Sequence, residues 1–294
     1  MSRHAYLIMA HNEFNLLKKL IILLDDPRND IYVHVDKKAK DFDPGQFQNL
    51  TQYAQLSLIK RKPITWEGYS VTDCIFRLME EAVKTHHNYY HLLSGMDLPI
   101  KSQDFIHDFF ENHGDLEYIE FDQRAIETKN FYNRIKYYHF FQEKIGKQRE
   151  GFYFFLKRLT LKTQEILRVD RTRKYPYAFK KGATWFSITH AFANYLLERQ
   201  ASIRDAYKFT LCADEIFLQT AAWNSHFRDN ICENYLRYID WKRGKPYVFK
   251  ADDFEELINS DALWARKFSE VKDPEIVDRI VRHINNFAST PSER

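Results

Sequence analysis

Glycine and proline are scarce in this chain of 294 residues, with eight of each. Such low numbers exclude long flexible linkers and low-complexity tracts, and no internal repeat is visible. The three cysteines are widely spaced, which excludes a disulfide framework or a cysteine-based metal site and favours a reducing environment. No apolar run approaches the roughly 18–20 residues of a membrane span, and no signal-peptide pattern precedes the first predicted strand. We therefore expect a cytoplasmic protein, at most peripheral on the inner face of the cell membrane.

The pattern that is present is that of an α/β protein with a large core, since 44% of the residues are hydrophobic. Residues 4–10 read as a buried strand, 13–24 as a helix with apolar residues at helical spacing, and 31–35 as a second strand. This order predicts a βαβ unit and hence a parallel sheet. Asp36 follows the second strand, at the edge where such sheets bind ligands. Neither a G-x-G-x-x-G nor a Walker motif is present, so a dinucleotide or P-loop site has no support.

Two adjacent carboxylates, Asp214 and Glu215, interrupt an apolar run at residues 211–220. We expect Asp214 to cap a helix, with Glu215 in its first turn at the edge of a core. Partial desolvation would suit Glu215 for work as a general base. The alternative is an acid that only complements the helix dipole, and the stretch alone favours this alternative.

Between Arg134 and Lys181 the chain carries 14 lysines and arginines against four acids, together with many aromatic residues. The simplest interpretation is a helical insertion whose long side chains cover a flank of the domain. A second is an anionic membrane surface approached by an amphipathic helix at 152–168. Nucleic-acid binding ranks last, because no known binding signature accompanies the charge, and we expect no nucleic-acid partner.

Several stretches resemble one known family, and they occur along the chain in the order that the family has. They cover most of residues 4–270 and read AYLIMAHN, IYVHVDKKA, WEGYS, HLLSGMDLPIKS, KKGATWFSIT, CADEIFLQT, LRYIDW and VFKADDFEELINSDALWARKF. Together they resemble the core-2/I-branching β-1,6-N-acetylglucosaminyltransferase and peptide O-xylosyltransferase family, glycosyltransferase family 14. Without a signal anchor or disulfides, the chain looks like a bacterial-type member that builds surface polysaccharide.

This resemblance implies a GT-A-like, Rossmann-like variant of the α/β class, with a mixed central sheet flanked by helices and a helical basic insertion. We expect one glycosyltransferase domain over 1–294. Its predicted parts are a nucleotide half at about 1–125, the insertion at about 131–175, an acceptor and catalytic half at about 176–270, and a C-terminal helix at 271–294.

The resemblance also assigns roles by position. Glu215 matches the catalytic base, Asp36 the residue that contacts uracil, and Lys267 the lysine that contacts the diphosphate. The family's partner arginine falls near Gly244, so either Arg243 or Lys245 must substitute for it. The remaining predicted contacts lie at the donor or acceptor lip (Met96, Asp97) and on the acceptor side (Trp185, Trp241, Arg134, Tyr137).

The family inverts configuration and lacks the DxD metal motif, and here Asp36 is a lone acid followed by two lysines. We therefore expect no divalent metal and no other cofactor, with fixed cations offsetting the diphosphate charge. The predicted reaction moves a sugar, N-acetylglucosamine from UDP-GlcNAc before xylose from UDP-xylose, in β linkage onto a glycan hydroxyl. The acceptor is then a glycan, and contact with an anionic membrane or a lipid-linked acceptor is a further expectation.

The rival class is a non-catalytic protein that binds nucleotides or carbohydrates. Adjacent Asp214 and Glu215 would make a poor glycosidase pair, because they point in different directions.

Overall fold

The computed structural model describes residues 2–126, 128–244 and 246–288. A seven-stranded sheet lies at its centre, in the order β3-β2-β1-β4-β7-β6-β8, and a three-stranded sheet has the order β5-β10-β9. The strands are β1 (His4–Ala10), β2 (Asn29–Val35), β3 (Gln55–Leu58), β4 (Tyr89–Ser94), β5 (Asp97–Pro99), β6 (Glu117–Ile119), β7 (Phe186–Thr189), β8 (Ile231–Cys232), β9 (Arg237–Ile239) and β10 (Trp264–Arg266).

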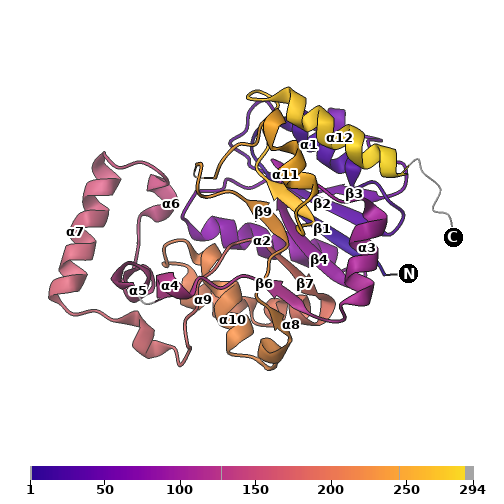
Figure 1. Cartoon of the computed structure of the whole chain (residues 1–294). Coiled ribbons are helices and arrows are strands. Elements are labelled where there is room, and N and C mark those ends of the chain that lie inside the picture. Colours follow the sequence, from indigo (N-terminus) through magenta and orange to yellow (C-terminus); the bar gives the residue numbers. More distant parts are fainter. Residues whose placement is uncertain (1, 127, 245, 289–294) are drawn as a thin grey trace.

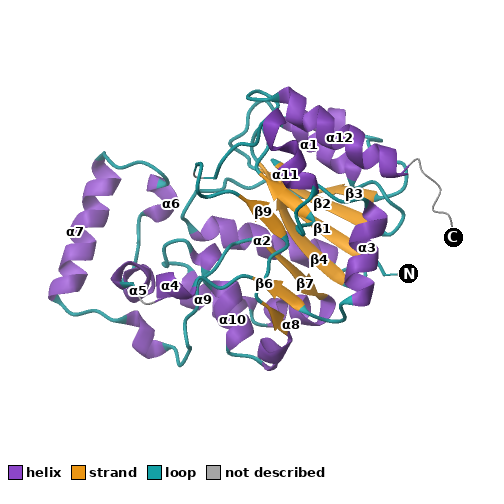
Figure 2. Cartoon of the chain, viewed as in Figure 1, coloured by secondary structure: helices purple, strands orange, loops and turns teal. Residues whose placement is uncertain are grey.

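The α-helices flank the central sheet on both faces (Figures 1 and 2). They are α1 (Phe14–Leu23), α2 (Tyr69–Ala82), α3 (Gln103–Asn112), α4 (Gln123–Ile126), α5 (Lys129–Lys136), α6 (Gln142–Ile145), α7 (Phe152–Ile166), α8 (His190–Glu198), α9 (Gln200–Tyr207), α10 (Phe217–Trp223), α11 (Phe254–Ile258) and α12 (Pro274–Ala288).

The sheet is mixed, as the sequence predicts. Strand β1 pairs in parallel with β2 and β4, and β2 pairs in parallel with β3, whereas β7 runs antiparallel to both of its neighbours. The parallel strands end at a common edge, and the loops that follow β1, β2 and β4 begin with His11, Asp36 and Gly95. The predicted α/β class with a mixed central sheet flanked by helices is confirmed.

Two hydrophobic clusters cover the two faces of the sheet, and β1 contributes to both because its side chains alternate. Tyr6 and Ile8 pack in the cluster that contains α1, α3 and α12. Ala5 and Leu7 pack in the cluster that contains α2, α8 and α10. Helices α5, α6 and α7 stand to one side of this body, in pink in Figure 1.

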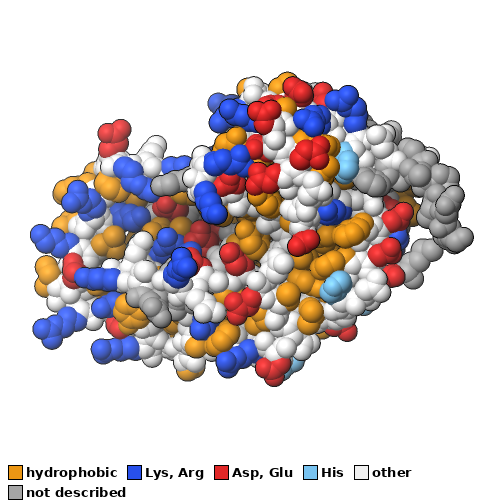
Figure 3. Space-filling model, viewed as in Figure 1, with side chains coloured by type: hydrophobic (Ala, Val, Ile, Leu, Met, Phe, Trp, Pro, Cys, Tyr) orange, Lys and Arg blue, Asp and Glu red, His pale blue; other side chains and the backbone are white. Residues whose placement is uncertain are grey.

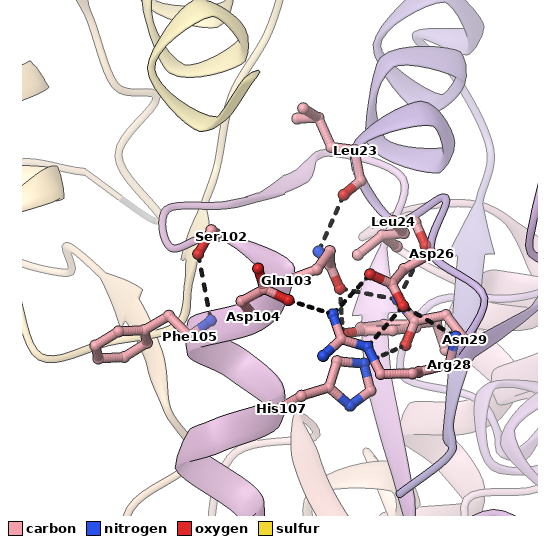
Figure 4. A network of polar contacts seen from close by, with 11 residues as sticks. Leu23, Leu24, Asp26, Arg28, Asn29, Ser102, Gln103, Asp104, Phe105 and His107 are labelled. Carbon is pink, nitrogen blue, oxygen red and sulfur yellow. Dashed lines mark hydrogen bonds and ion pairs between the residues drawn. The ribbon is translucent and has the colours of Figure 1, made fainter. Parts of the chain in front are cut away.

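The amino-terminal ends of the strands are tied by a separate polar network, shown in Figure 4. Arg28 pairs with Asp26 and with Asp104 of α3, at 2.7 Å each. Buried Asn29 donates to Gln103 at 2.8 Å, and His107 contacts the Asn29 side-chain oxygen at 2.9 Å. These contacts hold α3 against the amino-terminal end of β2. The loops that carry His11 and Asp36 lie at the opposite edge of the sheet.

Candidate active site

Glu215 lies in a short 3-10 turn, Ala213–Glu215, and α10 starts two residues later. The prediction that Asp214 caps a helix is wrong, because the residue before α10 is Ile216 and no side chain caps that helix. Asp214 instead accepts a hydrogen bond from the Thr184 hydroxyl at 2.8 Å. Burial, together with the neighbouring charge of Glu215, raises the pKa of Asp214 to about 6. Asp214 therefore ties the turn to the segment before β7.

The Glu215 carboxylate has two cationic neighbours, and both reach the same oxygen. Arg134 of α5 donates to Oε2 at 2.8 Å, and the Lys181 ammonium lies 3.6 Å from it. The side chain is 34% exposed, and Oε1 accepts no hydrogen bond from any described residue. One oxygen is thus held in place while the other can accept a proton from an approaching hydroxyl.

A glycine allows the segment before β7 to lie against this turn. The Gly182 amide donates to the Glu215 carbonyl at 3.0 Å. A Cβ atom on Gly182 would lie 1.8 Å from the Glu120 carbonyl oxygen, so any side chain there would displace the segment. Because the segment lies this close to the turn, Lys181 can reach Glu215 and Thr184 can reach Asp214.

A group of positive charges forms a second part of the site, around Lys267. Partial burial lowers the pKa of the Lys267 ammonium, and the charges of Arg266, Lys272 and Lys147 lower it further. Across the described residues, no acid lies within 4 Å of the Lys267 ammonium. Positive charges held together in this way attract a polyanion.

Arg266 is held beside Lys267 by two contacts. It pairs with Asp97 at 2.7 Å, and its guanidinium lies 4.3 Å from the centre of the Trp185 ring. The Asp97 carboxyl group is fully buried, and burial raises its pKa against the opposing effect of Arg266. This geometry favours a positioning role for Asp97 over the direct donor contact that we expected. The largely buried Met96 accepts a hydrogen bond at its carbonyl from the Phe268 amide at 2.9 Å, which fixes the loop after β4 beside the cations.

His11 lies near residues from both the N-terminal and the C-terminal parts of the chain. Burial is the main reason why its pKa is low; Arg266, Lys147 and Lys267 lower it further, and Asp36 opposes them. These four charges therefore lie close enough to His11 to affect its pKa. The structure brings the predicted residues Asp36 and Lys267 into one neighbourhood.

The Asp36 side chain shapes the loop around it. Its Oδ1 atom accepts hydrogen bonds from the Lys38 amide at 2.9 Å and the Ile64 amide at 3.2 Å. Both of these bonds use one oxygen, which leaves Oδ2 without a hydrogen bond from the described residues. An oxygen in that position suits the imide N–H of a uracil ring.

Residues 181–185 connect the carboxylate to the cations. Lys181 lies beside Glu215, and Trp185 stacks on Arg266. Four residue steps span at most about 14 Å of extended chain, which limits how far apart the two parts can lie. Lys147, in the loop after α6, lies 4.3 Å from the Trp66 ring centre and brings the insertion to the same place.

Other predicted residues lie in different settings. Arg243 pairs with Asp240, Asp253 and Glu256, so its charge is already balanced, and these pairs favour a structural role. Lys245 lies outside the described residues.

The residues predicted to contact the acceptor lie in different environments. Trp241 is 61% exposed and presents its ring to solvent. The partly buried Tyr137 follows α5, where its carbonyl accepts from Arg171 at 3.3 Å. Among the predicted acceptor residues, only Arg134 has a described contact with Glu215.

Sequence reasoning missed three cations of the site, Lys181, Arg266 and Lys147. The first two stand in the stretches KKGATWFSIT and ALWARKF, which also contain the identified residues Trp185 and Lys267, so their position was available as a signal. Lys147 is one of many basic residues in the insertion, and only the folded chain distinguishes it. Within the described ranges, no three His, Cys, Asp or Glu side chains gather as a metal site requires.

Comparison with known proteins identifies a family. The description "Core-2/I-Branching enzyme" belongs to the family whose profile matches residues 4–260. Curated relatives include dog xylosyltransferase 2, 22% identical over 311 residues, with 96% of this chain and 34% of that protein covered. Another is the β-glucuronosyltransferase GlcAT14B of Arabidopsis thaliana, 23% identical over 300 residues, covering 95% of this chain and 65% of that protein. The chain thus spans about a third of the length of the xylosyltransferases that it matches.

The structural alignments with solved structures have low TM-scores. Mouse xyloside xylosyltransferase 1 in its apo form aligns with a TM-score of 0.41 and 11% identity, over 90% of this chain and 97% of that one. The galactosyltransferase LgtC, solved with donor and acceptor sugar analogues, aligns with a TM-score of 0.40 and 9% identity, over 97% and 98% of the two chains. The family assignment rests on the sequence match.

Proposed function

Because the chain belongs to the Core-2/I-Branching enzyme family, we propose that it transfers a sugar from a UDP donor to a glycan hydroxyl, with inversion and without a divalent metal. The observation that carries this proposal is the Glu215 carboxylate, with Oε2 held by two cations and Oε1 open, together with a group of cations around Lys267, whose ammonium has no acid within 4 Å among the described residues. A general base and a diphosphate-binding cluster are the two parts that such a reaction needs.

In the proposed reaction, Glu215 Oε1 takes the proton of the acceptor hydroxyl as the hydroxyl oxygen attacks the anomeric carbon. The bond between that carbon and the UDP oxygen breaks on the opposite face, which gives a β linkage from an α-linked donor. Lys267, Arg266 and Lys147 balance the charge that develops on the leaving diphosphate. Positive side chains in these positions would do the work of a divalent ion.

We propose N-acetylglucosamine as the transferred sugar, with xylose as the alternative. The relatives are a xylosyltransferase and a β-glucuronosyltransferase by name, so UDP-xylose and UDP-glucuronic acid are the necessary comparisons. A cytoplasmic, bacterial-type enzyme at the inner face of the cell membrane, acting on a lipid-linked glycan, belongs to the same proposal.

A panel of UDP-sugars tests this function, with thermal shift as the measure of binding and UDP release as the measure of turnover. We expect UDP-GlcNAc to give the largest shift and the fastest release with a glycan acceptor, in EDTA as well as in Mn²⁺. Strict dependence on Mn²⁺ would contradict the metal-free mechanism. Binding without release for every donor and acceptor would identify a non-catalytic binding protein instead.

A further inference from the structure

The two buried residues of helix α7 are polar. Lys157 and Gln164 are buried. The Lys157 ammonium donates to the Gln142 side-chain oxygen at 2.6 Å, and Gln164 exchanges hydrogen bonds with the Tyr138 backbone at 2.8 and 3.0 Å. These polar contacts fasten α7 to the rest of the insertion. A helix on the surface of a globular protein normally buries its apolar side instead.

The apolar side of α7 faces outward. Its exposed residues follow the spacing of one helical stripe and are Phe152 (70% exposed), Phe155 (62%), Leu159 (51%) and Ile166 (71%). Neighbouring exposed large side chains are rare on a surface that meets only water. This stripe therefore has the form of a contact surface.

Positive charges flank the stripe. Arg158, Lys162 and Arg168 are exposed, and Glu165 is the only acid in residues 152–168. Figure 3 shows Lys and Arg side chains gathered with hydrophobic ones over the end of the molecule that α7 occupies. A second copy of the chain packed on this stripe would bring like charges together, whereas a surface of anionic lipid would neutralise them.

We infer that α7 lies on an anionic lipid bilayer, with its apolar stripe at the boundary between headgroups and acyl chains and its cations among the lipid phosphates. With 15 residues the helix is about 22 Å long. No helix among residues 2–126, 128–244 and 246–288 is long and apolar enough to cross a membrane, so α7 rests on the surface.

This contact has a consequence for the acceptor, which rests on the proposed function. The insertion that carries α7 also supplies Arg134 to Glu215 and Lys147 to the cation cluster. Docking α7 therefore turns toward the bilayer the side of the enzyme that carries the insertion, which contacts the proposed base through Arg134. An acceptor glycan attached to a membrane lipid fits this arrangement.

Sedimentation with lipid vesicles tests the inference on the intact protein. We expect it to pellet with vesicles of phosphatidylcholine and phosphatidylglycerol, and to bind vesicles of phosphatidylcholine alone far more weakly. The double variant Phe155→Ser/Leu159→Ser should reduce the partition coefficient about tenfold or more, since two inserted apolar side chains are lost. Ile22→Ser is the matched control, an exposed apolar residue on α1 that should leave binding unchanged.

The double variant Arg158→Glu/Lys162→Glu tests the contribution of charge. It should weaken binding to anionic vesicles as strongly as added salt weakens the binding of the wild-type protein. Equal binding to neutral vesicles, no binding to either, or full binding by the Phe155→Ser/Leu159→Ser variant would overturn the inference. So would dimerisation through the stripe, seen by sedimentation equilibrium without lipid. UDP-sugar affinity, measured in solution on the same variants, should not change, which separates this test from that of the transferase function.

Discussion

The Lys267 ammonium has no acid within 4 Å among the described residues, and three other cations act on it. Partial burial and three neighbouring cations lower its pKa, so a bound diphosphate would relieve the repulsion among these cations. Lys147 takes part in this repulsion from a distant part of the chain, and it approaches the site across the Trp66 ring. Both lysines should contribute to nucleotide affinity.

We predict that Lys267→Ala weakens UDP binding by tenfold or more, and Lys147→Ala by a few-fold, because each removes one charge from the diphosphate site. Calorimetric titration with UDP at low and high salt measures both effects. Lys84→Ala is the control, because Lys84 is an exposed lysine paired with Glu81 on α2. Equal affinity for all three variants would show that the diphosphate lies elsewhere.

Asp97 offers a second prediction about a single residue. Replacing it with asparagine leaves the Arg266 guanidinium without its buried counter-charge. We expect Asp97→Asn to lower the free energy of unfolding by about 2 kcal/mol or more and to weaken UDP binding as well. Urea denaturation and UDP titration measure the two effects. A stable variant with unchanged affinity would refute the positioning role.

The residue-level predictions from the sequence depended on neighbours in the chain. Asp36, Glu215 and Lys267 were identified because each stands in a recognisable stretch. The role of Asp214 was wrong because a hydrogen bond from Thr184, 30 positions away, competes with helix capping. Local sequence contains no information about such a partner.

Among the elements, helix α2 depends on the insertion for its cap. Gly68 precedes the helix and has no side chain to cap it, whereas Glu143 of α6 accepts a hydrogen bond from the Ser70 amide at 2.8 Å. A Cβ on Gly68 would approach the Glu143 carboxylate to 2.6 Å, so a larger residue there would displace the capping side chain. The carboxylate also complements the positive end of the helix dipole.

We predict that Glu143→Ala lowers the free energy of unfolding by about 1 kcal/mol, as the loss of a helix cap does. Because α6 would also lose its hold on α2, Arg134 and Lys147 should be less well positioned, and the KM for the acceptor should rise. Glu150→Ala, an exposed acid in the same insertion, is the control. Similar stability and kinetics for the two variants would show that the cap is unimportant.

The sequence predicts the bounds of the long elements more closely than those of the short ones. Strand β1 matches its predicted bounds because seven residues form one buried run. Strands β5, β9 and β10 have three residues each and pair across distant parts of the chain, so their small sheet leaves little local pattern. Helix α7 was predicted, but its apolar side was found to face outward only in the folded structure.

For the whole molecule, burial of titratable groups sets how stability depends on pH. Burial lowers the pKa values of His4, His91 and His107, so the stability that they contribute is present above about pH 6.5 and is lost as the pH falls. Burial raises the pKa of Glu117 to about 7, so the stability that it contributes is present at low pH and is lost as the pH rises through 7. The two kinds of group thus act in opposite directions.

We predict that Glu117→Gln gains stability relative to the wild type as the pH rises from 5 to 8.5, by about 2–3 kcal/mol over this range. The glutamine cannot ionise, so it escapes the cost of burying a charge beside Thr189. Urea denaturation of both proteins at several pH values measures the difference. A difference that stays constant with pH would mean that Glu117 does not titrate in this range.

The central claim concerns Glu215 as the base, and Glu215→Gln tests it most directly. The amide keeps the size of the side chain but cannot take the proton, so we expect the transfer rate to fall by about 10²–10⁴-fold. UDP affinity should remain within about twofold, because the diphosphate contacts lie around Lys267. Transfer at the wild-type rate by this variant, with UDP bound as tightly, would contradict the account.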